Sequence, residues 1–268
     1  CSLEVFLALA FVADFPPVVP KFYQRTHRVR LKNLDTTGKK SSHKIKHKKI
    51  PRVHFRARED IKTMSITKIV ITGGPCAGKT TGMSWIQNAF TERGYRVLFI
   101  SETATELISG GVAPWICSDN TEYQKCQMKL QLEKEKVFEQ AARTMDSDKI
   151  LIVCDRGTLD NKAYMTEADF SLVLNELGLN EVELRDGYDA VFHLVTAAKG
   201  AEKFYTTANN TARTENVDEA VALDDELIAA WTGHSHLRII DNSLGFEEKM
   251  KHLIAEIANF LGEPDHMR

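Results

Sequence analysis

Eight consecutive residues, Gly73–Thr80, have the types and the spacing that bind nucleotide phosphates. They read Gly-Gly-Pro-Cys-Ala-Gly-Lys-Thr and fit the pattern G-x-x-x-x-G-K-[ST]. In such a loop, backbone amides and the N-terminus of the following helix attract phosphate oxygens. Lys79 can reach the β- and γ-phosphates, and the Thr80 hydroxyl can bind Mg²⁺. The sequence therefore predicts that Mg²⁺ and a purine nucleoside triphosphate, ATP or GTP, bind here.

A carboxylate, Glu102, directly follows the apolar segment 96–101. If that segment is a strand of a parallel sheet, Glu102 lies at the carboxyl edge of the sheet, where ligands bind in such folds. A carboxylate there can take a proton from a substrate hydroxyl. The alternative is that Glu102 only caps a helix over residues 103–108, where an acidic residue suits the helix dipole.

Asp155 and Arg156 follow a second apolar segment, residues 149–154. An acidic residue in this position is typical of a Walker B site and would lie near Mg²⁺ or its waters. Arg156 can offer a planar, two-pronged donor to a phosphate. The alternative is a local Asp155–Arg156 turn, and Asp160 either contacts substrate or caps a helix. The expected catalytic residues are thus Glu102, Lys79, Arg156 and Asp155, and the expected metal ligands are Thr80 and Asp155.

Residues 206–213 are rich in Asn and Thr and end on Arg213. This composition is typical of a loop that closes over a small-molecule kinase site, brings a cation to the phosphates and excludes water. The alternative is a surface arginine that pairs with Glu215. With the first interpretation, the expected nucleotide-binding residues are Gly73, Gly74, Pro75, Cys76, Ala77, Gly78, Lys79, Thr80, Thr81 and Arg213.

The elements that must position these residues alternate along the chain after residue 66. Apolar, β-branched segments predict strands over residues 67–72, 96–101, 149–154, 190–196 and 237–240. Between them, helical patterns cover residues 79–93, 103–108, 121–145, 168–177, 217–231 and 246–261, with Thr166 as a candidate N-cap. Strands that are apolar throughout and separated by helices predict an α/β fold of three layers around a parallel five-stranded sheet.

The first 65 residues differ from the rest. Residues 21–58 hold 14 of the 35 Lys and Arg residues but only one acidic residue, Asp35, although the whole chain has a net charge of -2. We expect residues 1–65 to be a disordered extension, residues 66–262 to be one domain, and residues 263–268 to be a tail. Alternative interpretations of the basic segment are a transit peptide, an acidic-lipid arm or a nucleic-acid arm.

The five cysteines form no C-x-x-C pair, which favours a reducing compartment over a disulfide framework. No segment approaches the roughly 20 apolar residues of a membrane span. We therefore expect a cytoplasmic protein, with organellar targeting by the extension as the alternative.

Four motifs together resemble a known group of proteins. They are Glu102-Thr103-Ala104-Thr105-Glu106-Leu107, Asp155-Arg156-Gly157-Thr158-Leu159-Asp160 with Ala163-Tyr164, Gly200-Ala201-Glu202-Lys203-Phe204-Tyr205-Thr206, and Asp241-Asn242. They look like the P-loop AAA-like domain of the NadR/TRPL-translocation-defect type. The resemblance covers about residues 66–262 and implies a nucleoside-kinase-like core.

This resemblance implies two different functions. NadR-type members are ribosylnicotinamide kinases, and in the more distant deoxynucleoside kinases the positions of Glu102 and Arg156 hold the base and a phosphate-binding arginine. The TRPL-translocation-defect members resemble the chain over longer stretches. They are GTP-binding trafficking proteins that bind phosphoinositide-type lipid and carry a C-terminal CYTH-like domain, which would begin where this chain ends at Arg268. They imply an anionic lipid or a protein as partner.

Two hypotheses follow. The first is Mg-dependent phosphoryl transfer from the nucleotide to a small-molecule hydroxyl acceptor. The second is a GTP-binding regulatory or trafficking adaptor with little or no kinase activity. A Ras-like switch does not fit, because the run Asn161-Lys162-Ala163-Tyr164 has Tyr where the guanine signature needs Asp. Any nucleic-acid binding by residues 21–58 would be electrostatic and non-specific.

Overall fold

The computed structural model describes residues 64–201, 203 and 216–263. Arg213, the extension up to residue 63 and the tail from residue 264 lie outside this part. Our expectations for them, and for the domain boundaries, stay predictions.

Within the described part, five parallel strands form one sheet in the order β2-β3-β1-β4-β5. The strands are β1 (Ser65–Thr72), β2 (Arg96–Ile100), β3 (Lys149–Asp155), β4 (Ala190–Leu194) and β5 (Leu237–Ile240). β1 is central, with β3 and β4 as its neighbours. The predicted five-stranded parallel sheet is confirmed.

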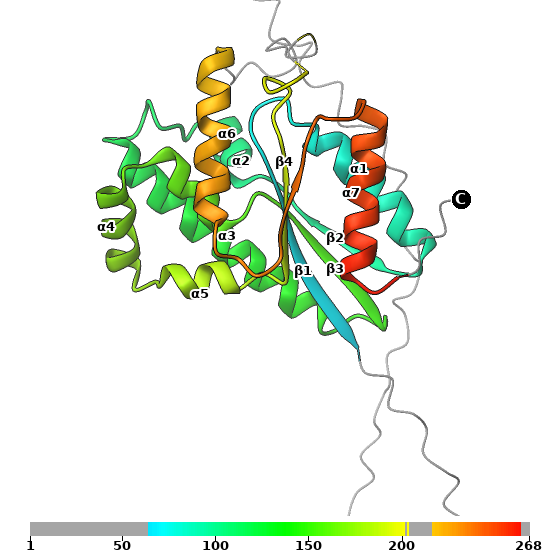
Figure 1. The fold of residues 1–268 in the computed structure, drawn as a ribbon. Coiled ribbons are helices and arrows are strands. Elements are labelled where there is room, and N and C mark those ends of the chain that lie inside the picture. Colours follow the sequence, from blue (N-terminus) through cyan, green and yellow to red (C-terminus); the bar gives the residue numbers. More distant parts are fainter. Residues whose placement is uncertain (1–63, 202, 204–215, 264–268) are drawn as a thin grey trace, which may run out of the picture. The chain divides into compact units, whose positions relative to one another are not determined.

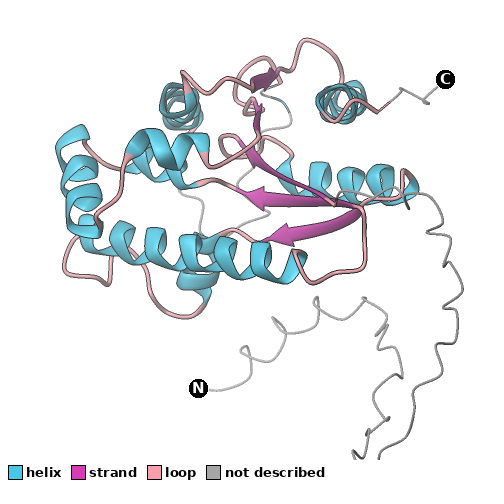
Figure 2. Ribbon diagram, turned by 90° about the horizontal axis from the view of Figure 1, so that it is seen from below, coloured by secondary structure: helices cyan, strands magenta, loops and turns pink. Residues whose placement is uncertain are grey.

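Helices cover both faces of this sheet and make it the middle of three layers (Figures 1 and 2). On one face lie α1 (Lys79–Glu92) and α7 (Phe246–Phe260). On the other lie α3 (Asn120–Ala142), α4 (Glu167–Leu177), α5 (Glu181–Asp186), α6 (Val217–Trp231) and the 3₁₀ helix η1 (Thr158–Tyr164). The short helix α2 (Thr103–Ser109) follows β2.

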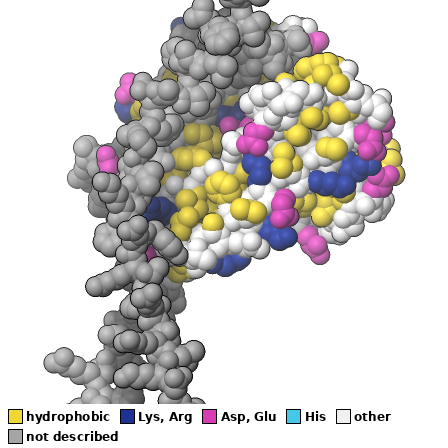
Figure 3. All heavy atoms as spheres, turned by 180° about the vertical axis from the view of Figure 1, so that it is seen from behind, with side chains coloured by type: hydrophobic (Ala, Val, Ile, Leu, Met, Phe, Trp, Pro, Cys, Tyr) yellow, Lys and Arg dark blue, Asp and Glu magenta, His cyan; other side chains and the backbone are white. Residues whose placement is uncertain are grey.

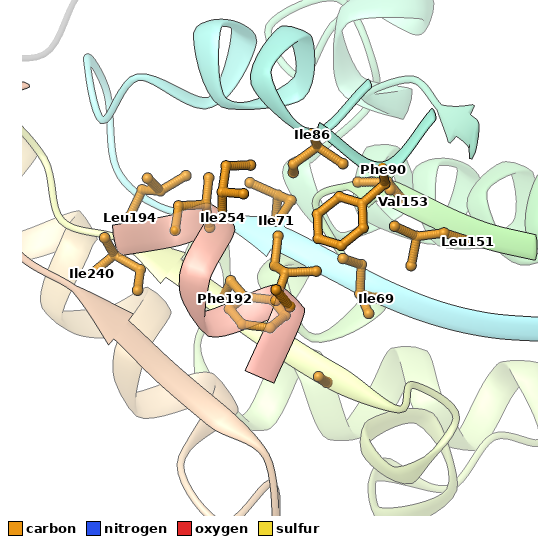
Figure 4. Close-up of a cluster of buried hydrophobic side chains, with 14 of the residues drawn as sticks. Ile69, Ile71, Ile86, Phe90, Leu151, Val153, Phe192, Leu194, Ile240 and Ile254 are labelled. Carbon is orange, nitrogen blue, oxygen red and sulfur yellow. The ribbon is translucent and has the colours of Figure 1, made fainter. Parts of the chain in front are cut away.

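The core consists of two clusters, one on each face of the sheet. Neighbouring residues of a strand point to opposite faces, so Ile69 and Ile71 join one cluster whereas Val70 joins the other. Figure 4 shows the first cluster, in which side chains of α1 and α7 cover the strands; its labelled residues are Ile69, Ile71, Ile86, Phe90, Leu151, Val153, Phe192, Leu194, Ile240 and Ile254. This packing holds the ends of β1, β3 and β4 in fixed positions.

Several elements differ from the sequence-based prediction. The helix predicted over residues 121–145 spans Asn120–Ala142. It ends there because the Thr144 and Met145 amides donate to the carbonyls three residues earlier, at Ala141 and Ala142, as in a 3₁₀ turn, instead of four residues earlier. η1 and α5 were not predicted, since both are short. The predicted N-cap is confirmed, as the Thr166 hydroxyl accepts a hydrogen bond from the Asp169 amide.

On the face of the described part shown in Figure 3, hydrophobic, acidic and basic side chains are interspersed. None of the helices in the described ranges combines the length and the apolar character that crossing a membrane requires.

Candidate active site

The strand order gathers the predicted residues at one edge of the sheet. β3 pairs with both β1 and β2 in parallel, so the segments that follow these three strands leave the sheet side by side. They are the phosphate loop (Gly73–Thr80) after β1, Glu102 after β2, and Asp155 and Arg156 at the end of β3. Of the predicted site residues, only Arg213 lies outside the described part.

Two glycines give the phosphate loop its shape. Gly73 and Gly78 have φ angles of 141° and 94°, in the region that favours glycine. A Cβ on Gly73 would lie 2.1 Å from the Leu194 carbonyl oxygen, and one on Gly78 would lie 2.8 Å from the ring of Phe246. Both glycines are therefore needed for the loop to turn into α1 against β4 and α7.

Glu102 and Arg156 form an ion pair across the ends of β2 and β3, in which Arg156 Nε donates to Glu102 Oε1. The Thr105 hydroxyl donates to the other carboxylate oxygen at 2.7 Å. Glu102 occupies the N-cap position of α2, yet its side chain makes no capping hydrogen bond to a backbone amide. The carboxylate therefore bonds to Arg156 and to the Thr105 hydroxyl in the first turn of α2, and not to a backbone amide of that turn.

Burial alone would raise the pKa of Glu102. The positive charges of Arg156 and Lys79, with hydrogen bonds from Thr105 and Arg156, outweigh burial and hold this pKa at about 2. Glu102 is therefore a carboxylate at neutral pH. The low pKa of Glu102 depends mainly on Arg156, a cation that can also bind a nucleotide phosphate.

Arg156 has a backbone conformation that is uncommon for a residue with a side chain, with φ at 70°. Its amide donates to the Ile71 carbonyl at 3.0 Å, and its carbonyl accepts from Gln131 at 3.1 Å, so both neighbours fix the turn. Burial opposes the charge, but Tyr164 and Glu102 raise the pKa of Arg156 well above its ordinary value. Its Nη1 is buried without a hydrogen-bond partner among the described residues and remains available as a donor.

Lys79 and Asp155 complete the charged cluster. Burial, and then the charge of Arg156, lowers the pKa of Lys79, while Asp155 opposes this shift. Burial raises the pKa of Asp155, while the charge of Lys79 opposes the rise. A bound phosphate or cation would relieve the unfavourable burial of each group. Thr80 and Thr81 are exposed at the start of α1.

The residues at this edge fit a Mg²⁺ ion. Mg²⁺ takes oxygen ligands, keeps several waters and needs only one or two protein groups beside the phosphates of a substrate. Asp155 Oδ1 is buried without a hydrogen-bond partner among the described residues, and the Thr80 hydroxyl lies at the loop end. The described ranges hold no group of three or more His, Cys, Asp or Glu suited to a metal, so phosphate oxygens would have to complete the shell.

One face of α3 brings further polar groups to this edge. Tyr123, Gln124 and Gln127 are at most 7% exposed. The Tyr123 hydroxyl and the side-chain carbonyl oxygens of Gln124 and Gln127 lack hydrogen-bond partners within the described ranges. Gln127 donates to Asn161 at 2.7 Å. Burial, together with the charge of Glu102, raises the pKa of Tyr123 to about 12. These residues had no motif in the sequence.

Asp160, for which two roles were open, is 2% exposed and acts within the fold. Its carboxylate accepts the Gly157 amide at 2.6 Å, where η1 begins, and the Thr72 hydroxyl. Trp231 of α6 adds a weaker contact at 3.4 Å. The capping interpretation agrees with these contacts.

Two buried residues next to the phosphate loop were not predicted from the sequence. Asp224 of α6 accepts a hydrogen bond from the Gly74 amide, and Lys249 of α7 donates to the Ala77 carbonyl. They lie 150 and 172 residues further along the chain than their loop partners, in helices whose local patterns signal only amphipathic character. The sequence signal that could have pointed to them is a charged residue on the otherwise apolar, buried side of each helix.

The family comparison agrees with this geometry. The model of a family described as an AAA domain matches residues 68–249, which include the phosphate loop, Glu102 and Arg156. No curated protein matches the chain. Among solved structures, the chain is similar to deoxyadenosine kinase from M. mycoides with bound dATP, at a TM-score of 0.48 and 16% identity, over 71% of this chain and 98% of that chain.

Proposed function

The chain belongs to the AAA domain family, and on that premise we propose that it transfers the γ-phosphoryl group of a Mg-bound purine nucleoside triphosphate to a hydroxyl group of a small molecule. The observation that carries the proposal is the meeting of three features at one edge of the sheet. They are the phosphate loop, the Glu102–Arg156 pair, and a buried oxygen of Asp155 without a partner among the described residues. In this proposal residues 73–81 bind the phosphates, and Arg213, which lies outside the described residues, supplies a further cation.

The reaction needs little covalent chemistry from the protein, because phosphoryl transfer depends on positioning and charge stabilisation. The acceptor oxygen forms a bond to the γ-phosphorus while the bond from that phosphorus to the bridging oxygen breaks. The nucleoside diphosphate leaves with the electron pair. Lys79 and Arg156 stabilise the charge on the phosphoryl oxygens, and Glu102 accepts the acceptor's proton.

The Glu102–Arg156 pair links nucleotide binding to base strength. Before the nucleotide binds, Arg156 holds the pKa of Glu102 low, and a carboxylate with so low a pKa is a weak base. When Arg156 turns to the phosphates, Glu102 loses its strongest cationic partner. Its pKa then rises, and its ability to accept a proton rises with it.

Thr80 and Asp155 are the residues that would hold Mg²⁺. When bound, the ion neutralises the charge that develops on the β- and γ-phosphates. Asp155 would at the same time obtain a partner for its buried oxygen.

The acceptor lies against α3 in this proposal. Buried polar atoms normally have partners. The unsatisfied atoms of Tyr123, Gln124 and Gln127 in the described part offer an O–H donor and two carbonyl acceptors on α3, and Tyr123 is near enough to Glu102 for that charge to raise its pKa. A neutral molecule with several hydroxyl or amide groups, such as a nucleoside, matches that set. A purely apolar acceptor would leave these atoms unsatisfied.

A second candidate function is nucleotide-dependent binding without transfer, as in a GTP-binding adaptor with a protein or anionic lipid as partner. The observation that favours it is the same ion pair. If Arg156 keeps its bond to Glu102 after the nucleotide binds, Glu102 stays a weak base and the pair only joins β2 to β3.

Steady-state turnover of the full chain separates the two functions. Mg-ATP and Mg-GTP are each supplied with and without a panel of nucleosides that includes ribosylnicotinamide. We expect acceptor-dependent turnover, and a loss of about 10²–10⁴-fold in kcat in Glu102→Gln, because general base catalysis is removed.

The matched control is Glu106→Gln, which changes an exposed carboxylate on α2 that pairs with Lys134. We expect its turnover to stay close to that of the unmodified chain. Tight nucleotide binding without acceptor-dependent turnover for any member of the panel would favour the adaptor.

A further inference from the structure

Two buried side chains of opposite charge contact the backbone of the phosphate loop. Asp224 of α6 is 0% exposed and Lys249 of α7 is 3% exposed. The Gly74 amide donates to Asp224 Oδ1 at 3.0 Å, and Lys249 Nζ donates to the Ala77 carbonyl at 3.1 Å. The two contacts lie on either side of Pro75 and Cys76, so they hold both ends of the turn that faces the phosphates.

Asp224 joins the loop to the end of β4. The oxygen that accepts the Gly74 amide also accepts the Thr196 amide at 3.1 Å and lies 3.0 Å from His193 Nε2. The second oxygen accepts Lys199 at 2.9 Å. Burial would raise the pKa of Asp224, but the hydrogen bonds from His193, Lys199 and Gly74 lower it to about 2. Asp224 is therefore charged at neutral pH.

Lys249 makes the matching connection from the other face of the sheet. Besides Ala77, its ammonium donates to the Val195 carbonyl at 2.6 Å and to Asn242 Oδ1 at 2.8 Å. The amide group of Asn242 donates in turn to the Thr196 carbonyl at 2.8 Å. These three acceptors of Lys249 are uncharged, so none of them cancels its positive charge.

The surroundings leave the loop little freedom. The Thr196 hydroxyl donates to the Pro75 carbonyl. A Cβ on Gly74 would lie 2.8 Å from the Asp224 carboxylate, so the loop backbone is in close contact with that side chain. A loop whose peptide groups are oriented before binding loses less conformational freedom when a ligand arrives, which strengthens binding.

We propose that Asp224 and Lys249 are positioning residues for nucleotide binding, which fix the peptide groups at Gly74 and Ala77 in the orientation that receives the phosphates. A buried charged group is a poor source of stability compared with apolar residues of similar size, so their placement against this one loop indicates a binding role. The inference rests on the nucleotide-binding half of the proposed function and is independent of phosphoryl transfer.

The test compares nucleotide affinity in matched variants of the full chain. Asp224→Ala removes the acceptor, and Asp224→Asn keeps the size and one acceptor oxygen but removes the charge. The control is Asp225→Ala, because Asp225 also pairs with Lys199, at 2.7 Å, but is exposed. Lys249→Met is compared with Lys251→Met, a change at a partly exposed lysine of the same helix that pairs with Glu248.

The measurement is the Kd of Mg-bound, non-hydrolysable ATP and GTP analogues by calorimetry, beside the unfolding free energy without nucleotide. We expect Asp224→Ala and Lys249→Met to raise Kd by about 10-fold, as befits one lost hydrogen bond to a charged group. Asp224→Asn should recover part of the loss, and both controls should stay within about 2-fold. If Asp224→Ala does not fold, Asp224→Asn and Lys249→Met carry the test.

A second readout separates positioning by charge from a role in packing. Burial lowers the pKa of Lys249 to about 8, while Asp224 and Asp241 oppose that shift. Affinity should therefore fall as the pH rises through 8, and fall less in Lys249→Met. No binding by the unmodified chain would contradict the proposed function itself. If the unmodified chain binds nucleotide and the Kd is unchanged in the Asp224 and Lys249 variants, this inference is overturned while the proposed function stands.

Discussion

At the scale of single residues, the site is an arrangement of charges that balance one another. Glu102 is held ionised by Arg156 and Lys79, and half-buried Asp155 has one buried oxygen that is unpaired among the described residues. A phosphate or a cation that enters changes every one of these interactions. Perturbed pKa values of this kind cluster at functional sites.

The Glu102–Arg156 pair makes stability depend on pH in a way that a variant can isolate. The pKa of Glu102 is about 2 in the folded chain and ordinarily 4.5, so its stabilising contribution is complete above pH 4.5 and is lost as pH falls toward 2. Arg156→Met removes the largest lowering effect. Between neutral pH and about pH 3, the unmodified chain should lose about 2 kcal/mol more unfolding free energy than this variant does.

Urea unfolding at the two pH values measures this difference. The control is Arg143→Met, an exposed arginine whose partner Glu139 lies 3.4 Å away. It should show the pH dependence of the unmodified chain. Equal pH dependence in Arg156→Met would mean that Arg156 does not set the pKa of Glu102.

The residues with a motif could be predicted from the sequence, and those without one could not. The G-x-x-x-x-G-K-[ST] pattern located the phosphate loop, and the ends of two apolar segments located Glu102, Asp155 and Arg156. Asp224 and Lys249 act through contacts with loop residues that are far away in sequence. Such contacts are set by how α6 and α7 pack, and no local pattern encodes them.

At the scale of elements, the strand order is what makes a site from separate segments. All five strands were predicted, because β-branched apolar runs are a strong local signal. The order β2-β3-β1-β4-β5 was not predicted, since it depends on which strands pair. That order brings the ends of β2 and β3 beside the phosphate loop.

The turn after β3 depends on close packing against α6. Gly157 follows Arg156, and a Cβ there would lie 2.5 Å from the ring of Trp231 and 2.9 Å from Val70. Gly157→Ala should therefore lower the unfolding free energy by about 1–3 kcal/mol through overpacking. Urea denaturation measures the change.

Gly245→Ala is the matched control, because Gly245 has an ordinary backbone and a Cβ added to it would meet no neighbouring atom within 4 Å. It should cost about 1 kcal/mol or less, as for the loss of a glycine at a helix N-cap. A similar cost for both variants would show that Trp231 does not constrain this turn.

At the scale of the whole molecule, nucleotide binding and folding are linked. The phosphate loop contacts β4, α6 and α7, so a ligand that binds it stabilises all of them together. Mg-ATP or Mg-GTP at about 100 times its Kd should add about 2.7 kcal/mol of stability. For a domain of this size that raises Tm by about 5–10 °C.

Differential scanning calorimetry with and without nucleotide checks this rise. It should shrink strongly in Lys79→Ala, which removes the cation that we propose binds the phosphates. It should persist in Lys129→Ala, a change at an exposed lysine of α3. A shift that is equal in both variants would mean that the nucleotide binds elsewhere.

The measurement that tests the central claim most directly is the fate of a labelled γ-phosphoryl group. The full chain is incubated with Mg²⁺, γ-³²P-labelled ATP or GTP and a nucleoside panel, and the products are separated. We expect label to move to an acceptor with the unmodified chain and with Glu106→Gln, and this transfer to be lost in Glu102→Gln. Label that stays in the nucleotide or appears only as inorganic phosphate, while the nucleotide binds, would contradict the claim.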